Sequence, residues 1–558
     1  MILIQKQNNN LIKVRHIGND NKEFFRFFMF IKSLEARKFT TNGFIIDSKF
    51  TEQLQNKFDT EIEKPIWDDM GADMKLSPFS YQKEAIYFCL HHPNSLVICP
   101  PGTGKTPICI GTYLELLKHN ITDKPGAICV KASLKYQWVK EIQKFSNLRA
   151  KAIDTPAKAK KKFDSQFEDV DLMVLNYETF KNEQVRNKLR EVGIECIILD
   201  EIHAIGSNFK TAKAQALYNF NDLKVKIGLT ATPITRDPEN LFSIFNMIDP
   251  NLFKNHSSFA RDFLIYRTYG QIAGVKNKEV LKNKIAPYMF IKTEEQIAKQ
   301  LPELIVSEVH CEMTKDMAKI NAMIFDKLDD LKKQSFDIEK NTADKKQLET
   351  NEEYNMIRAQ ILAYQTFAQE LIDDPRLFDL SDSTLVKDLS CKDKTSPKLD
   401  LLLDLLDNII TSNNSKVCIF TRFEKMQSIL KDKIENKFKT KCAIVNGSLD
   451  SKERQRQAYD LFQETDEYSV LIATNAMSEG ISLSACNYLI EYDLADSYAM
   501  QTQRHGRVRR ANSVHKTSYV YQLIMDEPNG NSWDLIAQRI IDKKRNYDND
   551  IIQDLNKE

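Results

Sequence analysis

Short apolar runs alternate with longer helical patterns from about residue 76 onward. Runs of this kind, bounded by polar or turn residues, are typical of strands buried on both faces of a parallel sheet. They lie at Leu96–Cys99, Ala127–Val130, Leu172–Leu175, Cys196–Leu199 and Lys226–Leu229. Helical patterns separate them, for example at Ile108–Leu117 and Lys135–Phe145. The alternation predicts a doubly wound α/β domain.

A second block with the same alternation begins at about residue 397. Its predicted strands are Val417–Phe420, Cys442–Val445, Val470–Ala473 and Tyr488–Glu491. Between the two blocks, Met313–Lys333 and Tyr354–Ile372 have helical periodicity and flank a polar, charged stretch. We therefore expect two α/β lobes that face a cleft. The expected parts are a small strand-containing module at 1–75, lobe 1 at 76–302, a helical connector or protrusion at 303–395, lobe 2 at 396–529 and a helical tail at 530–558.

Composition places the chain among globular proteins. It has 558 residues, of which 42% are hydrophobic and 28% charged. The 79 basic residues are balanced by 78 acidic ones, so any nucleic-acid binding must come from local patches. The ten cysteines are spread too widely for a zinc ribbon or a redox pair and fit a reducing compartment. The chain shows neither a signal-peptide layout nor about 20 consecutive apolar residues, so we expect a cytoplasmic protein without membrane contact.

A glycine-containing loop follows the first strand of lobe 1. The strand Leu96–Cys99 runs into Pro100-Pro101-Gly102-Thr103-Gly104-Lys105-Thr106, and a helical pattern follows. Such a loop points backbone N–H groups and a helix dipole at a phosphate chain. Lys105 can reach the β- and γ-phosphates, and the Thr106 hydroxyl can bind Mg²⁺. The nucleotide contacts are therefore predicted at Pro101, Gly102, Thr103, Gly104, Lys105 and Thr106; the alternative is an ordinary glycine turn before a helix.

Two adjacent carboxylates end another buried strand. The run Cys196–Leu199 is followed by Asp200, Glu201 and, two residues later, His203. Buried carboxylates are costly unless they serve a cation or a reaction. Asp200 is predicted to hold Mg²⁺, and Glu201 to orient and deprotonate the attacking water. His203 is predicted to couple this site to its neighbours; the alternative for the acidic pair is a favourable position at a helix N-terminus.

In this order the motifs resemble those of superfamily-two helicases, in the Swi/Snf-type branch of DNA translocases. The resemblance covers about residues 76–525 and implies two RecA-like lobes. It implies that Gln82 recognises adenine, and that Thr230 and Thr232 couple hydrolysis to motion. The stretches Ala132–Trp138 and Asn176–Thr179 resemble the branch's nucleic-acid motifs.

The second lobe continues the resemblance. Gln503, Gly506, Arg507 and Arg510 fit the signature Q-x-x-G-R-x-x-R, and Thr474–Leu483, which includes Gly480, is similar to the family's fifth motif. The resemblance implies that Arg507 and Arg510 reach across the cleft to the γ-phosphate, with Gln503 in the same catalytic set and Gly480 near the nucleotide. It implies nucleic-acid contacts at Ser133, Lys135, Tyr177, Arg422, Asn446 and Thr474.

The chain departs from the family at three places. It has Phe290-Ile291-Lys292-Thr293 in place of a basic segment, Ala231 where glycine is frequent, and Ala511-Asn512 in place of Gly-Gln. The first and leading expectation is an ATP- and Mg²⁺-dependent DNA translocase or helicase in replication, recombination or repair, monomeric, without sequence specificity, in a bacterium or bacterial virus. The alternatives are an RNA helicase and a DNA-binding scaffold with a vestigial motor.

Overall fold

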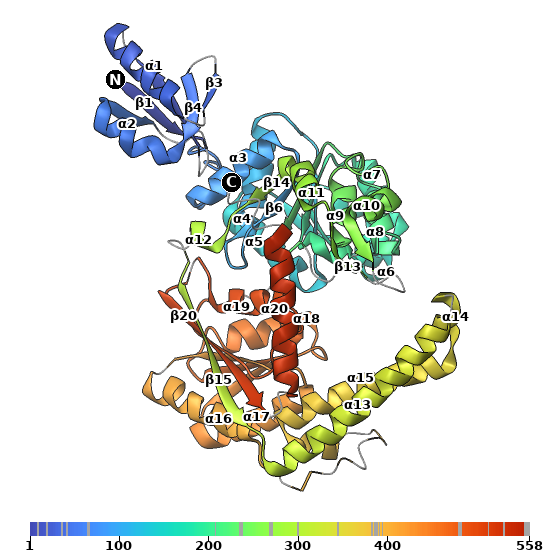
Figure 1. The fold of residues 1–558 in the computed structure, drawn as a ribbon. Helices are drawn as coiled ribbons and strands as arrows, with labels where there is room; N and C mark the ends of the chain where they lie inside the picture. Colours follow the sequence, from blue (N-terminus) through green and yellow to red (C-terminus); the bar gives the residue numbers. More distant parts are fainter. Residues whose placement is uncertain are drawn as a thin grey trace.

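The computed structural model comprises an N-terminal module, two α/β lobes and a long helical hairpin (Figure 1). It describes the chain except for residues 8–10, 18–20, 35–36, 41–42, 64–66, 207, 234–237, 267–271, 298–300, 343–344, 381–382, 384, 386–388, 390, 393, 414, 478–482, 512, 528–530 and 552–558. Gly480 therefore lies outside the described residues. Within the described part, no helix combines the length and apolarity needed to cross a membrane.

The N-terminal module is a mixed sheet with two helices. Its strands are β1 (Ile2–Lys6), β2 (Leu11–His16), β3 (Arg37–Thr40), β4 (Gly43–Asp47) and β5 (Thr60–Glu63), in the order β3-β4-β2-β1-β5. The helices are α1 (Asn21–Ser33) and α2 (Thr51–Lys57). Phe27 of α1 packs edge-on against Phe44 and Phe58, so aromatic side chains form the centre of this small core.

Lobe 1 is built on a parallel sheet of order β14-β6-β11-β10-β7-β9-β8. The strands are β6 (Asn94–Ile98), β7 (Gly126–Val130), β8 (Ala150–Ala152), β9 (Leu172–Asn176), β10 (Cys196–Asp200), β11 (Val225–Thr230) and β14 (Met289–Ile291). Successive residues of β10 enter opposite cores, Ile197 on one face and Ile198 on the other. Because strands alternate their side chains, a sheet covered by helices on both faces requires the uniformly apolar runs seen in the sequence.

Helices cover both faces of the lobe 1 sheet. Residues of α3 (Ser80–His91), α4 (Lys105–Lys118) and α5 (Lys135–Phe145) pack on one face, while those of α7 (Glu183–Val192), α8 (Ala212–Tyr218), α9 (Asn240–Ile248), α10 (His256–Phe263) and α11 (Lys278–Ile285) pack on the other. Shorter elements are α6 (Pro156–Ala159), α12 (Glu294–Ile297) and the antiparallel pair β12 (Leu264–Tyr266) and β13 (Ile272–Val275).

Lobe 2 repeats this architecture. Its parallel sheet has the order β15-β20-β19-β16-β18-β17. The strands are β15 (Glu303–Glu312), β16 (Val417–Phe420), β17 (Lys441–Val445), β18 (Tyr468–Ala473), β19 (Tyr488–Glu491) and β20 (Thr517–Asp526), and the helices are α16 (Pro397–Leu406), α17 (Glu424–Phe438), α18 (Ser451–Gln455) and α19 (Tyr498–Val508). The two parallel sheets with helices on both faces confirm the predicted α/β fold of two lobes.

One strand of lobe 2 lies in the stretch that the sequence predicts to be a helical connector. All ten residues of β15 pair in parallel with β20, from Glu303 opposite Thr517 to Glu312 opposite Asp526. β15 is an edge strand, half open to solvent, and its sequence mixes polar with apolar residues. It therefore lacks the apolar run that marks the inner strands. The helical hairpin is an insertion between β15 and α16.

The hairpin consists of α13 (Lys315–Asn341), α14 (Lys345–Thr350) and α15 (Glu352–Asp373), and it projects away from lobe 2 (Figure 1). Ile324 and Leu328 of α13 share an apolar core with Phe367 and Leu371 of α15. The last helix, α20 (Trp533–Ile551), packs against β20 and α19 and extends along the molecule toward lobe 1 (Figure 1).

Candidate nucleotide site between the lobes

The loop between β6 and α4 has the backbone geometry of a phosphate cradle. Gly102 and Gly104 have φ angles of 80° and 72°, in the left-handed region that favours glycine. Lys105 is the first residue of α4, and its Nζ donates to the carbonyl oxygen of Cys99 at 3.1 Å. The ammonium group and the N-terminus of α4 therefore lie together at the concave side of the loop, where an anion is favoured.

Gln82 lies directly behind this loop. Its Nε2 donates to the carbonyl oxygen of Thr103 at 3.0 Å, and its Oε1 accepts from the backbone N–H of Phe79 at 2.8 Å. A Cβ on Gly104 would meet Gln82 Nε2 at 2.6 Å, so glycine is needed for this close approach. The carboxamide predicted to read adenine thus has partners at both ends within the chain and supports the loop.

Asp200 occupies the carboxyl end of β10 and is buried. The indole Nε1 of Trp138 donates to Asp200 Oδ2 at 3.1 Å, and the Tyr177 hydroxyl donates to the Asp200 carbonyl oxygen at 2.8 Å. Burial, together with the negative charge of Glu201, raises the pKa of Asp200 to about 6. An oxygen ligand in such a place gains from a nearby cation.

Glu201 has a φ of 48°, an uncommon value for a residue with a side chain. This backbone conformation places its carboxylate at the pocket, with Oε2 3.3 Å from His203 Nδ1. Burial opposes ionisation, but the electrostatic interactions with His203 and Lys105 outweigh it and lower the pKa of Glu201. The lowered pKa favours the ionised carboxylate, the form that can accept a proton from water.

A short polar chain leads from these carboxylates to the neighbouring strand. His203 Nδ1 lies 3.0 Å from Thr230 Oγ1 at the end of β11, and the backbone N–H of Thr232 donates to the same hydroxyl at 3.1 Å. All three residues are buried. The predicted coupling residues Thr230 and Thr232 are thus joined to the carboxylate pair through His203.

Lobe 2 completes the pocket. Arg504 holds α19 against the sheet, because its Nη1 donates to the Asp493 carbonyl oxygen at 2.7 Å and to Glu491 Oε1 at 3.1 Å. Burial lowers the pKa of Arg510, which lines the pocket. The pocket is lined from both lobes by Pro101, Gly102, Gly104, Lys105, Thr106, Leu134, Gln137, Trp138, Glu141, Asp200, Glu201, Gln503, Arg507 and Arg510.

Helix α5 contributes lining residues to which the sequence motifs assign no nucleotide role. Gln137, Trp138 and Glu141 follow Leu134 at intervals of three, four and seven residues. That spacing places them on one helix face. The spacing was visible in the sequence, but the direction of this face depends on the packing of α5 on the sheet.

Three predicted nucleic-acid residues share one edge of lobe 2. Arg422, Asn446 and Thr474 follow β16, β17 and β18, which are neighbours in the sheet. The carboxyl ends of parallel strands lie at the same edge. Arg422 is partly exposed and paired with Asp496, and Asn446 Nδ2 donates to Gln427 Oε1 at 3.0 Å.

Two other predicted nucleic-acid residues point inward. Lys135 is buried, and its Nζ donates to the Ile153 carbonyl oxygen at 3.1 Å and pairs with Asp154. Tyr177 is buried behind Asp200. Both side chains thus have partners within lobe 1 in this structure, and their assignment to nucleic-acid contact stays a prediction. The side chain of Ser133 lies outside the described residues.

Two family models match the chain. The SNF2-related domain matches residues 19–377, and the helicase conserved C-terminal domain matches residues 397–512. Together with the two lobes, these matches identify the chain as an ATPase of the helicase class. The chain belongs to the SNF2-related family, as the sequence resemblance implies.

Curated relatives are named as helicases and translocases. YwqA of Bacillus subtilis, named as an ATP-dependent helicase/translocase, is 24% identical over 424 residues, which cover 74% of this chain and 43% of YwqA. YqhH of the same organism, an uncharacterized ATP-dependent helicase, is 24% identical over 83% of this chain and 81% of YqhH. A RAD54-like DNA repair and recombination protein of Drosophila pseudoobscura pseudoobscura is 25% identical over 79% of this chain and 58% of its own. The chain thus spans less than two thirds of the length of YwqA and of the RAD54-like protein.

One similar solved structure is the SWI2/SNF2 ATPase core of Sulfolobus solfataricus in complex with double-stranded DNA. The match covers 86% of this chain and 94% of the Sulfolobus chain. The sequence identity is 23% and the TM-score is 0.38.

Proposed function

We propose that this protein hydrolyses ATP and uses the energy to move along or remodel DNA. The observation that carries the proposal is the pocket between the lobes, where Lys105 and Glu201 of lobe 1 face Arg507 and Arg510 of lobe 2. Phosphoryl transfer depends mostly on positioning and on stabilising charge in the transition state. A site whose cations come from two lobes becomes complete only when the lobes approach, which links hydrolysis to domain movement.

The donor set suits Mg²⁺ as well as a nucleotide. Thr106 and Asp200 both line the pocket and offer the oxygen atoms that Mg²⁺ prefers. Bound there, the ion would neutralise negative charge on the phosphate oxygens. We assign Lys105 and the loop backbone to phosphate binding, Glu201 to proton acceptance from the attacking water, and Arg507 and Arg510 to the charge of the transition state.

We propose that DNA is the nucleic acid along which the protein moves, in replication, recombination or repair. Support comes from the family and from the name of the RAD54-like relative. We assign phosphate contact to the lobe 2 edge at Arg422, Asn446 and Thr474. Contacts to phosphate position a protein without reading sequence, so we expect no sequence specificity. The relatives in Bacillus subtilis support a bacterial or phage setting, in which we place the protein in the cytoplasm as a monomer.

The proposal predicts ATP hydrolysis that DNA stimulates and that Glu201→Gln removes. The amide cannot accept the proton, so kcat should fall by at least about a hundredfold while ATP still binds. Phosphate release measured with single-stranded, duplex, forked and four-way DNA, and in parallel with RNA, checks this result. Stronger stimulation by RNA would favour the RNA helicase, and ATP binding without turnover in the unsubstituted protein would favour the scaffold.

Arg422→Ala tests the DNA edge. Loss of one phosphate contact should raise the DNA concentration for half-maximal stimulation about fivefold. DNA binding should also depend less steeply on salt concentration, while kcat at saturating DNA should change little. Arg456→Ala is the matched control, because Arg456 is an exposed arginine of lobe 2 paired with Glu453. Equal DNA dependence in the two variants would remove Arg422 from the contact surface.

A further inference from the structure

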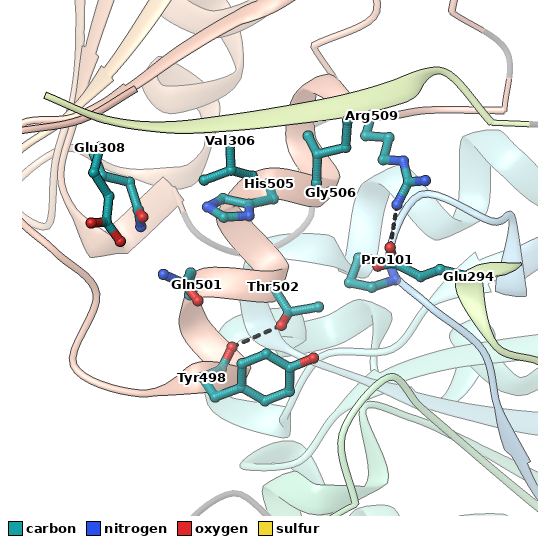
Figure 2. A pocket seen from close by; sticks show the side chains of 12 residues that line it. Pro101, Glu294, Val306, Glu308, Tyr498, Gln501, Thr502, His505, Gly506 and Arg509 are labelled. Carbon is teal, nitrogen blue, oxygen red and sulfur yellow. Dashed lines mark hydrogen bonds and ion pairs between the residues drawn. The ribbon is translucent and has the colours of Figure 1, made fainter. Parts of the chain in front are cut away.

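We propose that Arg509 is a positioning residue that fixes Arg507 and Arg510 of lobe 2 against the phosphate loop. The proposal rests on the function proposed above and adds a residue to which the motif assigns no role. Arg509 stands between Arg507 and Arg510 in the sequence, just after α19. Its side chain pairs with Glu294 (Figure 2) and bonds Pro302, where the chain passes from lobe 1 to lobe 2.

The guanidinium of Arg509 joins two parts of the chain. Its Nε donates to the carbonyl oxygen of Pro302 at 2.9 Å, and its Nη1 forms an ion pair with Glu294. Glu294 begins α12, at the end of lobe 1, and Pro302 immediately precedes β15, the first strand of lobe 2. The Arg509 side chain is 11% exposed. One nearly buried cation therefore connects the last helix of lobe 1, the connecting segment and the end of α19.

The backbone beside Arg509 lies directly on the phosphate loop. A Cβ on Gly102 would meet the Arg509 carbonyl oxygen at 2.1 Å, and a Cβ on Gly506 would meet Pro101 Cβ at 2.3 Å. The backbone N–H of Ala511 donates to the Gly102 carbonyl oxygen at 3.2 Å. Glycine at both positions lets the two lobes touch through their backbones. The segment that carries Arg507 and Arg510 is thus seated on the loop that binds phosphate.

Arg509 acts from outside the nucleotide pocket. Together with Glu294, Val306 and His505, it lines a cavity of about 570 Å³ (Figure 2), whereas Arg507 and Arg510 line the nucleotide pocket. Its effect on hydrolysis must therefore pass through the position of its neighbours. A guanidinium suits this role, because its planar fork can serve a carbonyl and a carboxylate at once, whereas an ammonium group lacks that fixed geometry.

The experiment compares the steady-state ATPase of Arg509→Ala, Arg509→Glu and the exchange variant Arg509→Glu with Glu294→Arg. We expect the alanine variant to lose roughly tenfold in kcat with the KM for ATP changed by less than about twofold, because positioning of the transition-state charge is affected more than ground-state binding. Arg509→Glu should lose more, because it faces Glu294 with a second carboxylate. The exchange variant should recover most of that additional loss, since it restores the attraction.

The matched control is Arg190→Ala, which removes an arginine paired with Asp222 within lobe 1 and should leave kcat unchanged. Full kcat in Arg509→Ala, or no recovery in the exchange variant, would overturn the positioning role. Failure of the proposed function is distinguishable, because it would appear as absent turnover, or turnover independent of Glu201, in the protein with Arg509 intact.

A second readout does not depend on turnover. Spin labels placed by Asp123→Cys in lobe 1 and Asp404→Cys in lobe 2 occupy sites that are 83% exposed. Nine of the ten native cysteines are buried, and a Cys311→Ser background removes the half-buried one. We expect Arg509→Ala to broaden the distance distribution between the lobes and the exchange variant to narrow it again. An unchanged distribution in Arg509→Ala would contradict the proposal.

Discussion

Arg507→Ala should lower kcat by about a thousandfold or more, the range that arginine fingers supply in phosphoryl transfer. Arg507 lies on α19, and its side chain lines the pocket together with Lys105 and Glu201 from the other lobe. Negative charge spreads over the phosphoryl oxygens during transfer, and a cation held at that position stabilises it without reorganisation. ATP binding should weaken much less, because the phosphate loop of lobe 1 remains intact.

Single-turnover hydrolysis and equilibrium nucleotide binding, measured on the same variant, separate the loss of kcat from the loss of ATP affinity. Arg507→Lys should recover little, because an ammonium group cannot reproduce the planar set of donors. Arg454→Ala, which removes a partly buried arginine of lobe 2 bonded to the Gly447 carbonyl oxygen, controls for the loss of a positive charge. A kcat within about threefold of the unsubstituted protein would remove Arg507 from the reaction.

The inner strands could be predicted because burial on both faces demands an uninterrupted apolar run. Cys196–Leu199 and Val417–Phe420 satisfy that demand, and both lie at the centre of their sheets. β15 could not be found in this way. At the sheet edge one side of the strand meets solvent, so polar residues such as Glu308 alternate with Val309 and the apolar signal disappears.

Site residues could be predicted from the sequence where their role follows from their place at the end of a strand or the start of a helix. Lys105 and Asp200 are fixed by the ends of strands and the start of a helix, and those boundaries are visible in the sequence. The direction of a side chain depends on distant partners. Asp154 draws Lys135 inward, and the carbonyl oxygen of Asp200 takes the Tyr177 hydroxyl. Neither partner is adjacent in sequence, so a motif could not reveal these contacts.

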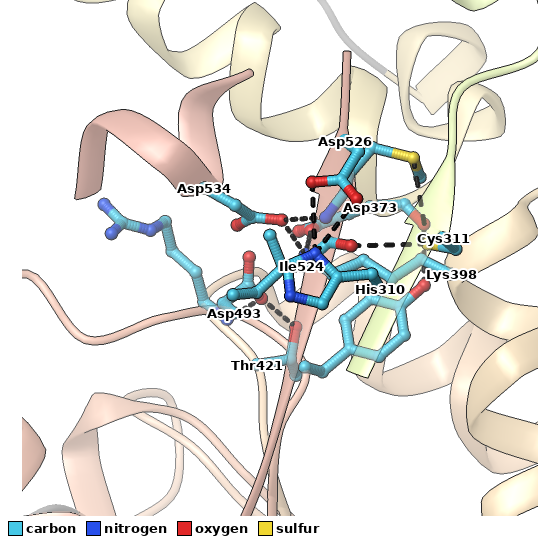
Figure 3. Close-up of polar contacts among 12 residues, drawn as sticks. His310, Cys311, Asp373, Lys398, Thr421, Asp493, Ile524, Asp526 and Asp534 are labelled. Carbon is cyan, nitrogen blue, oxygen red and sulfur yellow. Dashed lines mark hydrogen bonds and ion pairs between the residues drawn. The ribbon is translucent and has the colours of Figure 1, made fainter. Parts of the chain in front are cut away.

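Lobe 2 also contains a buried cluster of charged residues that the sequence pattern does not predict. Lys398 of α16 is fully buried, with Nζ 2.8 Å from Asp534 Oδ2 and 3.5 Å from Asp373 Oδ1 (Figure 3). Asp493 lies beside them and accepts from the Thr421 hydroxyl at 2.9 Å. The cluster joins the end of α15, the start of α20 and the carboxyl edge of the sheet. Burial and the charge of Asp493 raise the pKa of Asp373 well above its usual range.

Lys398→Met should therefore destabilise lobe 2 by about 3–5 kcal/mol, the typical result of removing one partner from a buried ion pair. The substitution takes away the cation and leaves buried carboxylates without compensation, and their desolvation then opposes folding. Amide hydrogen exchange of β16 and β19 measures the free energy of opening in this lobe without requiring the whole chain to unfold in one step.

Two comparisons make the prediction sharp. Lys437→Met removes an exposed lysine of the same lobe and should change the opening free energy by less than about 1 kcal/mol, as expected for a surface ion pair. Adding Asp534→Asn to Lys398→Met should recover part of the loss, because it removes one unpaired carboxylate. If Lys398→Met exchanged no faster than Lys437→Met, the cluster would not hold the hairpin, the last helix and the sheet together. Recovery by Asp534→Asn would identify uncompensated charge, rather than lost packing of the lysine stem, as the cause of the destabilisation.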